Sequence, residues 1–411
     1  MEEWKEYRLG DICTKIGSGA TPKGGKEAYL GGNTSLIRSQ NVLDFSFSWD
    51  GLAYIDDEQA AKLNGVIIES GDVLLNITGD SVARSCVVPE SALPARVNQH
   101  VSIVRGEASI VLNDYILYFL QYKKPYLLSL SQGGATRNAL TKGMIEDLLI
   151  PLPSLSKQAE IVRVLKSLDD KIELNKRIND NLEQQAQALF KSWFVDFEPF
   201  KDNEFVESEM GMIPKGWRVK SLSEIADYVN GLAMQKYRPE DGEIGLPVLK
   251  IKELGQGGFD TNSDYCSPSK IGEKYIIKDG DIIFSWSGTL MVKIWCGGKC
   301  GLNQHLFNVV AKNYPKWFAY QWTRHHLDNF IRIAKDKAVT MGHIKRGELD
   351  KAKVLIPESH QMNTISDIMK PIHLQMISNE LESRRLAELR DTLLPKLMSG
   401  ELKVNEVEEC I

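Results

Sequence analysis

The stretch Gly71-Asp72-Val73-Leu74-Leu75 returns later in the chain as Gly280-Asp281-Ile282-Ile283-Phe284. Each copy is followed at the same distance by a hydroxyl residue and a glycine, Thr78-Gly79 in the first copy and Ser287-Gly288 in the second. In both copies a Gly-Asp pair precedes an apolar run, the pattern of a turn that leads into a short β-strand. The two copies indicate that one structural unit occurs twice.

Three further matches keep the same order along the chain. Trp4, Leu9, Asp11 and Ile12 return as Trp217, Leu222, Glu224 and Ile225, Asn98-Gln99-His100 returns as Asn303-Gln304-His305, and Leu149-Ile150-Pro151-Leu152-Pro153 returns as Val354-Leu355-Ile356-Pro357. The offset falls from 213 to about 204, as small loop deletions would produce. Because the order is kept throughout, the chain is an internal repeat of two halves.

Length and composition set the broad class of the protein. The chain has 411 residues, which is more than one hydrophobic core organises, so two or three domains are expected. The acidic, polar N-terminus and the lack of a long apolar run predict neither a signal peptide nor a membrane span. The six scattered cysteines favour reduced thiols and a cytoplasmic location.

The charge balance does not by itself favour a nucleic-acid partner. The formal net charge is −5, residues 1–150 hold 14 basic and 18 acidic side chains, and residues 201–355 hold 23 and 19. Neither segment is strongly basic. Any contact with DNA must therefore use local patches, or a partner must supply positive charge.

The first part of each repeat, roughly residues 1–152 and 205–357, combines short β-like runs with one helix. The helix is expected over residues 114–129 in the first half and over residues 317–333 in the second. The β-like runs are Val66-Ile67-Ile68, Val73-Leu74-Leu75, Val101-Ser102-Ile103-Val104, Ile276-Ile277, Ile282-Ile283-Phe284 and Phe307-Asn308-Val309-Val310. Each first part is predicted to be an α+β domain of ordinary size.

The second part of each repeat is predicted to be one long helix. The first helix has Ser156 as its N-cap and ends at Pro199, and the second begins near Ser359 and is stopped by Pro395. Seam positions recur at alternating steps of four and three, which is typical of a coiled coil. The predicted seam consists of Ile161, Leu165, Leu168, Ile172, Asn175, Leu182, Leu189, Ile365, Met369, Ile372, Met376, Asn379, Leu386 and Leu393.

Asn175 and Asn379 occupy equivalent positions in this seam, where a buried asparagine costs stability but fixes register. If the helices pair antiparallel, one domain lies at each end and the chain acquires a pseudo-twofold axis. A helix of about 38 residues is about 57 Å long, which matches about 17 base pairs of duplex. The alternative is a pair of ordinary amphipathic helices, each packed on its own domain.

With these features the chain resembles the specificity (S) subunits of Type I restriction-modification systems over nearly its whole length. The ends of the two helices, residues 189–199 and 393–402, resemble the closing segments of the family's conserved regions. The opening from Trp4 to Ile12, followed by Gly17-Ser18-Gly19-Ala20-Thr21-Pro22, resembles the start of a target recognition domain. Pro151-Leu152-Pro153 with Gln158 resembles the start of a conserved helix, and its counterpart, Ile356-Pro357 with Gln361, is one residue shorter.

The resemblance implies an α+β fold with two tandem α/β target recognition domains, residues 1–152 and 201–357. Two helical spacers, residues 153–200 and 358–411, would separate them and form an antiparallel coiled coil with a pseudo-twofold internal repeat. Each recognition domain would read one half of a bipartite, asymmetric site on double-stranded DNA. The helices would set the gap between the halves.

The resemblance also implies partners that carry the chemistry. Two modification subunits would use S-adenosylmethionine to methylate adenine, and restriction subunits would use ATP and Mg²⁺. This chain would hold no cofactor, no metal and no catalytic residue, and it would touch no membrane. In agreement, the sequence has no Asn-Pro-Pro-Tyr motif, and its glycine-rich stretch over residues 17–26 lacks the spacing of a phosphate loop.

Base reading needs polar side chains that offer matched donors and acceptors, and Asn, Gln, Arg and Lys do this best. The candidates occupy three loops in each domain. They are Ser18, Thr21, Lys23, Arg38, Ser39, Gln40, Asn41, Thr136, Arg137, Asn138 and Lys142 in the first domain, and Gln235, Lys236, Lys250, Lys252, Thr340, His343 and Lys345 in the second. For any one of them the alternative is a solvated loop residue.

Two other motifs have a structural interpretation. The repeated Asn-Gln-His is expected to fix a turn, because residues that read different half-sites should differ between the halves, and contact with DNA is the alternative. No partner for His100 or His305 as a catalytic base is visible in the sequence. Cys296-Gly297-Gly298-Lys299-Cys300 is expected to be a turn between strands, with a metal site as the alternative.

Three other functions remain open at this point. They are a stand-alone bipartite DNA-binding protein, a scaffold with degenerate domains, and an enzyme with an unrecognised site. Salt-dependent binding to duplex DNA separates a DNA reader from a scaffold. Methylation by the isolated chain would identify an enzyme.

Overall fold

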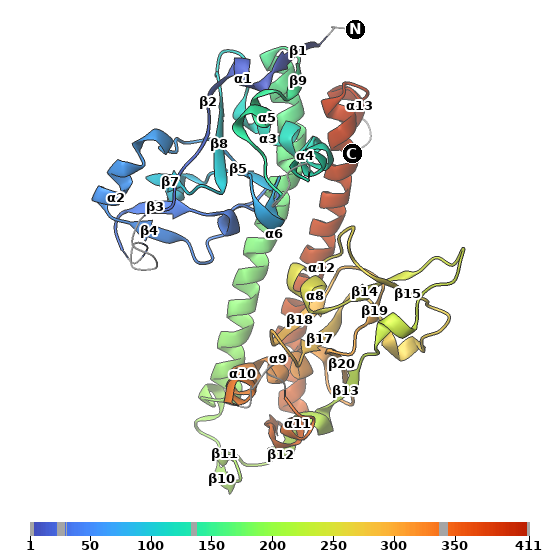
Figure 1. Cartoon of the computed structure of the whole chain (residues 1–411). Helices are drawn as coiled ribbons and strands as arrows, with labels where there is room; N and C mark the ends of the chain where they lie inside the picture. The colour runs from blue at the N-terminus through green and yellow to red at the C-terminus, as the bar shows by residue number, and fades with distance from the viewer. Residues whose placement is uncertain (1–3, 23–28, 30, 133–137, 337–343, 409–411) are drawn as a thin grey trace. The chain divides into compact units, whose positions relative to one another are not determined.

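The computed structural model describes residues 4–22, 29, 31–132, 138–336 and 344–408 (Figure 1). The chain divides into two compact units, of which unit 1 comprises residues 1–171 and 386–411 and unit 2 comprises residues 172–385. Two helices of 40 residues each, α6 (Leu155–Phe194) and α12 (Ser359–Met398), contribute one segment to each unit. Each unit therefore combines an α+β domain with a stretch of both helices.

Unit 1 contains two small sheets and one separate strand pair. The first sheet is antiparallel, in the order β2 (Cys13–Ser18), β8 (Val101–Gly106), β5 (Val73–Asn76) and β6 (Ser85–Val87). In the second sheet, β3 (Thr34–Ile37) pairs antiparallel with β4 (Ala53–Ile55) and parallel with β7 (Ala95–Val97). The separate pair is β1 (Lys5–Arg8) with β9 (Leu149–Leu152). The helices are α1 (Leu9–Ile12), α2 (Asp57–Lys62), α3 (Asn113–Tyr122), α4 (Lys124–Ser131), α5 (Lys142–Glu146) and α13 (Val404–Glu408).

Unit 2 repeats this strand order. Its antiparallel sheet runs β13 (Ala226–Asn230), β20 (Leu306–Ala311), β17 (Asp281–Ser285) and β18 (Met291–Trp295), and its mixed sheet runs β15 (Tyr265–Cys266), β14 (Leu246–Leu249), β19 (Cys300–Leu302) and β16 (Ile276–Ile277). The pair of β12 (Arg218–Ser221) with β21 (Lys353–Ile356) corresponds to β1 with β9. A hairpin of β10 (Phe205–Ser208) and β11 (Gly211–Pro214) precedes it. The helices are α7 (Leu222–Ile225), α8 (Ile251–Gln256), α9 (Lys316–His325), α10 (Leu327–Asp336) and α11 (Gly347–Lys351).

The duplicated apolar stretch lies between two cores in each unit. Side chains of a strand alternate between its two faces, so neighbouring residues enter different cores. In β5, Val73 and Leu75 join the core beneath the helices, and Leu74 joins the core of the second sheet. In β17, Ile282 and Phe284 face the helices and Ile283 faces the mixed sheet. A run that is apolar at every position is therefore what this place in the fold requires.

The cores beneath the helices join each domain to α6 and α12. In unit 1, Tyr115 and Phe119 of α3 are fully buried in one cluster with Leu165 of α6 and Leu397 of α12. In unit 2 the corresponding cluster is Phe190 and Phe194 of α6, Trp317 and Trp322 of α9, and Ile365 and Met369 of α12. Burial of each such side chain contributes about 1.5–3 kcal/mol.

The helix segments pair antiparallel within each unit. In unit 2, Asn175 donates to the Asn379 carbonyl (3.4 Å) and Asn179 donates to the Met376 carbonyl (3.0 Å). Residue numbers therefore increase along α6 while those of the paired residues decrease along α12, as in an antiparallel pair. In unit 1, Arg390 of α12 contacts Asp169 of α6 at 2.7 Å. All fourteen seam residues are buried or half-buried. Asn175 and Asn379, the two asparagines of the predicted seam, are in direct contact.

Three predicted helix boundaries are wrong. Pro395 does not stop the second helix, because α12 continues to Met398 and the Pro395 carbonyl accepts from the Ser399 N–H at 3.0 Å. Burial of Leu394, Leu397 and Met398 offsets the cost of a proline in the last turn. The first helix begins at Leu155, before the predicted N-cap Ser156, and ends at Phe194, before Pro199.

The single helix predicted in each domain is two helices. In unit 1, α3 ends at Tyr122 and α4 begins at Lys124, with Pro125 in the first turn of α4. Proline fits a first turn because it has no N–H to leave unpaired. In unit 2 the break is at His326, between α9 and α10. The run Val66-Ile67-Ile68 is also not a strand, because Val66 closes a 3₁₀ turn and Ile67 forms only an isolated bridge with Arg96.

Candidate nucleic-acid interface

The Asn-Gln-His turn of unit 1, residues 98–100, is tied together by side-chain hydrogen bonds. The Asn98 Oδ1 accepts from the His100 backbone N–H at 3.0 Å, which fixes the turn. The His100 ring lies between two partners, with Nδ1 2.6 Å from Thr78 Oγ1 and Nε2 3.0 Å from Gln99 Nε2. The Thr21 hydroxyl donates to Gln99 Oε1. The turn therefore holds the Gln99 amide in a defined place.

The Asn-Gln-His turn of unit 2, residues 303–305, has the same geometry. The Asn303 Oδ1 accepts from the His305 backbone N–H at 3.3 Å. The His305 Nδ1 lies 3.0 Å from Ser287 Oγ, and its Nε2 lies 3.3 Å from Gln304 Nε2. The hydroxyl-glycine pairs of the repeat thus have a function in the fold, because Thr78 and Ser287 orient the two histidines. The expected structural role of the asparagine is confirmed.

The sequence shows no partner for His100 or His305, but the structure supplies a hydroxyl for each. A hydroxyl beside an imidazole is also the pair used in nucleophilic catalysis. In such sites a third group, usually a carboxylate, orients the far nitrogen of the imidazole. Here that nitrogen faces the neutral amide of Gln99 or Gln304. The histidine of each turn therefore holds the side-chain amide of Gln99 or Gln304 in place.

In unit 1 the three predicted DNA-contacting loops meet at this turn. The Gly19 N–H donates to the Asn98 carbonyl (3.1 Å), and the Asn98 N–H donates to the Ile37 carbonyl (3.1 Å), just before Arg38. The Gly79 N–H donates to the Asn138 carbonyl (3.1 Å). The loops around Ser18, Arg38 and Asn138 are distant in sequence but lie around one centre.

Backbone bonds also hold three loops of unit 2 around its own turn. The Asn303 N–H donates to the Leu249 carbonyl (3.1 Å), just before Lys250, and the Leu232 N–H donates to the Leu302 carbonyl (2.9 Å). The Ile344 N–H donates to the Trp286 carbonyl (3.2 Å), which brings Lys345 to the same place. The loop residues differ between the units although the backbone pattern is shared. A constant frame therefore presents variable side chains.

The individual candidates fall into four groups. Lys23, Thr136, Arg137, Thr340 and His343 lie outside the described residues. Exposed side chains are presented by Ser18, Thr21, Gln40, Asn138, Lys142, Gln235, Lys236, Lys252 and Lys345, and half-buried ones by Arg38, Ser39 and Lys250. Asn41 is fully buried.

Asn41 corrects the sequence prediction. Its amide donates to the Ser48 carbonyl (3.0 Å), and its Oδ1 accepts from the Arg38 N–H (3.0 Å). These bonds satisfy buried backbone groups, so the side chain fixes the loop and does not face a base. Arg38 donates to the Gly51 carbonyl, and Gln40 donates to the Asp50 carbonyl at 3.0 Å.

Two of the candidate lysines of the second domain are held by carboxylates. Lys250 pairs with Asp264, and Lys252 pairs with Asp260 at 2.7 Å. The hydrogen bond from Lys250 holds the pKa of Asp264 below its ordinary value, and Lys252 does the same for Asp260. Both pairs are exposed, and such pairs contribute about 0–1 kcal/mol, so a phosphate can replace the carboxylate at little cost.

The cysteine motif is the turn that was predicted. Residues 296–299 connect β18 to β19, and Gly298 has a φ of +88°, a left-handed conformation that glycine adopts most easily. Burial raises the pKa of the Cys296 thiol to about 12. Within the described ranges, no group of three or more His, Cys, Asp or Glu is placed to hold a metal ion. The Cys296 carbonyl instead accepts from Arg384 at 2.6 Å.

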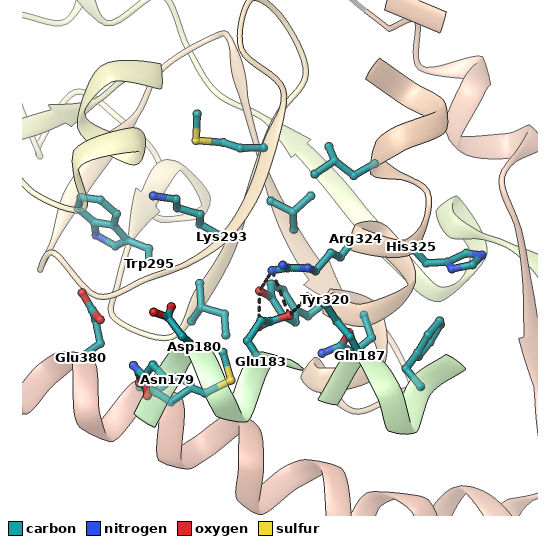
Figure 2. Close-up of a pocket in the computed structure, with 18 of the residues that line it drawn as sticks. Asn179, Asp180, Glu183, Gln187, Lys293, Trp295, Tyr320, Arg324, His325 and Glu380 are labelled. Carbon is teal, nitrogen blue, oxygen red and sulfur yellow. Dashed lines mark hydrogen bonds and ion pairs between the residues drawn. The ribbon is translucent and has the colours of Figure 1, made fainter. Parts of the chain in front are cut away.

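A pocket of about 810 Å³ in unit 2 is lined by α6, β18, α9 and α12 (Figure 2). Figure 2 shows Glu183 of α6 facing Arg324 and Tyr320 of α9. The Glu183 Oε1 lies 3.0 Å from Arg324, and its Oε2 accepts from the Tyr320 hydroxyl at 3.1 Å. Lys293 donates to the Gly255 carbonyl at 2.9 Å, and burial lowers its pKa. The contacts of Glu183 join the α+β domain of unit 2 to α6.

Sequence analysis assigns Gln99 and Gln304 to a turn, and the structure adds that each amide lies beside the histidine of its turn. They appear in the repeated trio, but no sequence pattern shows that both would be held by a histidine. The signal was the identity of the trio in two halves whose other loops differ. None of the helices in the described part of the chain is both long and apolar enough to cross a membrane.

Comparisons with known proteins agree with this architecture. The type I restriction enzyme MjaIX specificity subunit of Methanocaldococcus jannaschii is 27% identical over 99% of this chain and 95% of its own length. The HindI specificity subunit of Haemophilus influenzae is 24% identical over 98% of this chain and all of its own length. The crystal structure of a type I restriction-modification S subunit from M. genitalium shares the fold, with a TM-score of 0.51 and 14% identity over 96% of each chain.

The family model of the type I restriction modification DNA specificity domain matches residues 1–184 and again residues 214–390. The two matches fall on the two halves of the internal repeat, and each includes one Asn-Gln-His turn. Together they cover most of the chain. The chain therefore belongs to the type I restriction-modification DNA specificity family.

Proposed function

We propose that this chain is the specificity subunit of a type I restriction-modification complex and that each recognition domain reads one half of a bipartite DNA site. The observation that carries the proposal is that each unit has an Asn-Gln-His turn of the same geometry with three loops around it. In each unit, backbone bonds join three loops to the turn or to the segment of the hydroxyl-glycine pair, and the loop side chains differ. Two readers built on one frame suit a site whose halves have different sequences.

The chemistry belongs to partner subunits in this proposal. Two modification subunits use S-adenosylmethionine to methylate adenine, and restriction subunits use ATP and Mg²⁺ to translocate and cleave DNA. This chain recognises the DNA sequence and supplies no catalytic group, and the complex acts in the cytoplasm. The names of the relatives, each a specificity subunit of a type I restriction enzyme, support this division of labour.

The helices α6 and α12 act as the ruler that fixes the gap between the half-sites, and their outer faces dock the modification subunits. Each helix has 40 residues, which is about 60 Å at 1.5 Å per residue. The buried asparagines of the seam fix the register of the pair, which a ruler of constant length requires.

The test is to co-express the chain with its modification subunit and to map methylated adenines across the genome. We expect a split motif, with two short specific halves around a fixed unspecified gap. A single continuous motif would mean that one domain does not read DNA. A stable complex that methylates nothing would favour a scaffold.

A deletion tests the ruler. Seven residues are removed around Asn175 in α6 and seven around Asn379 in α12, so that the seam keeps its 3-4 pattern. Each helix loses about 10 Å, and we expect the gap to shorten by about three base pairs while both half-sites stay the same. A matched control replaces the same residues with other seam-compatible residues at constant length, and its gap should not change.

A further inference from the structure

Gln99 and Gln304 occupy the same place in the two units and have the same support. Each side chain lies next to the histidine of its turn, at 3.0 Å in unit 1 and 3.3 Å in unit 2. Each histidine is in turn bound to a hydroxyl at the end of a central strand. The Gln99 side chain is exposed and that of Gln304 is half-buried.

The glutamine is not needed to make the turn. The asparagine closes it by accepting the histidine N–H, and the histidine carbonyl accepts from the residue before the hydroxyl pair, Ile77 in unit 1 (3.0 Å) and Trp286 in unit 2 (3.4 Å). The glutamine amide is added outside this frame. In unit 1 its Oε1 accepts from the Thr21 hydroxyl, but in both units one amide hydrogen is left for a contact with a ligand.

The identity of the pair indicates which part of the ligand it contacts. The three loops around each turn differ between the units, as side chains that read different bases must. Gln99 and Gln304 are the same residue with the same support. A group common to both readers fits a feature common to both half-sites, and the sugar-phosphate backbone is the feature that every duplex shares.

We propose that Gln99 and Gln304 each donate a hydrogen bond from the side-chain amide to a backbone oxygen of the DNA, at equivalent positions of the two half-sites. The inference rests on the proposed function and deepens it. A glutamine amide has two hydrogens, and the histidine Nε2 engages one of them. The contact fixes the position of each recognition domain on the DNA backbone of its half-site, and the position is the same in both halves. The variable loops then read the bases.

The contact has a property that separates it from a lysine contact. A neutral amide displaces no counterion, so its loss lowers affinity without changing the dependence of binding on salt. Loss of a lysine contact to a phosphate reduces the slope of log affinity against log salt by about one. Lys142 and Lys345, exposed candidates near the two turns, provide this comparison.

The test uses the full complex with the modification subunits and the variants Gln99→Ala, Gln304→Ala and the double variant. Binding is measured on a cognate duplex and on a scrambled duplex over a range of salt, and the methylated motif is mapped. We expect each single variant to lower affinity about fivefold on both duplexes, and the double variant to lower it about 25-fold. The salt slope and the motif should stay the same.

Two further variants keep the test clear. Gln256→Ala removes an exposed glutamine at the end of α8, away from the turn, and should bind like the wild type. Gln99→Glu replaces a donor by a negative acceptor and should lower affinity more than Gln99→Ala does, because it repels phosphate. Thermal unfolding of each variant complex should match that of the wild type.

The outcomes are distinguishable. Unchanged affinity in the double variant would overturn the inference and leave the glutamines as part of the turn. A motif relaxed at one position would also overturn it, because it would make the glutamine a base reader. A wild-type complex that methylates no split motif would instead overturn the proposed function.

Discussion

The two units share a fold but fasten their domains to the helices differently. In unit 1 the Tyr118 hydroxyl of α3 donates to Asp169 of α6 at 2.7 Å, and Arg390 of α12 contacts the same carboxylate at 2.7 Å. The Arg390 guanidinium also lies 3.7 Å from the centre of the Phe45 ring. In unit 2 the main contact is an aromatic cluster around Phe194.

The comparison shows which structural features are the same in both units and which differ. The Asn-Gln-His turn is the same in both units, down to the hydroxyl that orients the histidine. The joint to the helices needs only a buried, well-packed surface, which an ion pair or an aromatic cluster can provide. The constant part therefore lies where the shared function is proposed.

The largest expected effect is at the centre of the aromatic cluster. Phe194 is 2% exposed, and its ring centroid lies 5.0 Å from that of Phe190 and 5.7 Å from that of Trp322. We expect Phe194→Ala to destabilise unit 2 by about 3–5 kcal/mol, because a large cavity replaces the ring. Denaturant unfolding followed by tryptophan fluorescence measures this, since six of the eight tryptophans lie in unit 2.

The control is Tyr265→Ala, which removes an aromatic side chain of unit 2 that is 54% exposed. It should change stability by no more than about 0.5 kcal/mol. Equal losses in the two variants would show that the cluster does not hold unit 2 together.

The buried ion pair of unit 1 comes next. Burial raises the pKa of Asp169, and Arg390 opposes this shift. Arg390→Met should cost about 2–3 kcal/mol, because it leaves a buried carboxylate without its charge partner. Hydrogen exchange in α3 measures the loss locally. Arg385→Met, at an exposed position of the same helix, is the control.

A double variant sharpens this prediction. Asp169→Asn keeps an acceptor for Tyr118 and removes the charge. The double variant with Arg390→Met should therefore be more stable than Arg390→Met alone, because no buried charge remains. A double variant less stable than the single one would mean that Arg390 acts through its packing on Phe45.

The sequence predicts the repeat and its strands well, because these depend on local patterns. Val73-Leu74-Leu75 and Ile282-Ile283-Phe284 lie in β-strands as expected, and the helical seam follows from its 3-4 spacing. The prediction that the helix ends at Pro395 is wrong because it considers only the low helix propensity of proline. Packing around Leu394, Leu397 and Met398 keeps the last turn helical.

The candidate site was only partly predictable. The three loops of each domain could be chosen by composition, but their meeting at one turn depends on backbone bonds such as Asn98 N–H to the Ile37 carbonyl, which join distant residues. The burial of Asn41 could not be foreseen for the same reason, because Ser48 and Asp50 reach it only in the folded loop.

Acid should destabilise unit 2. Burial lowers the pKa of His373 to about 4, with Lys316 adding to the shift, and the ring packs against Tyr320. The unfolded chain binds a proton at this residue below pH 6.5, whereas the folded chain does so only near pH 4, so stability falls as the pH drops through this window. At pH 5 the loss is about 2 kcal/mol.

The fluorescence-detected unfolding of unit 2 at pH 7 and at pH 5 measures this effect. His326, whose pKa burial also lowers to about 4, adds to it in the same direction. The variant His373→Leu should show a weaker pH dependence than the wild type. An unchanged pH dependence in this variant would assign the effect to His326 and to other groups.

The smallest expected effect is at the ion pair of unit 2, which provides the matched comparison for Arg390. Arg324 is 34% exposed and faces Glu183 in the pocket of Figure 2, whereas Arg390 is 11% exposed. Solvent screens the more exposed Arg324 guanidinium, so its pair with Glu183 is weaker, and Arg324→Met should cost no more than about 1 kcal/mol. Unfolding of unit 2 under the conditions used for Phe194→Ala measures it. If Arg324→Met costs as much as Arg390→Met, burial does not explain the difference between the two joints, and the Glu183–Arg324–Tyr320 cluster holds unit 2 as firmly as the aromatic rings do.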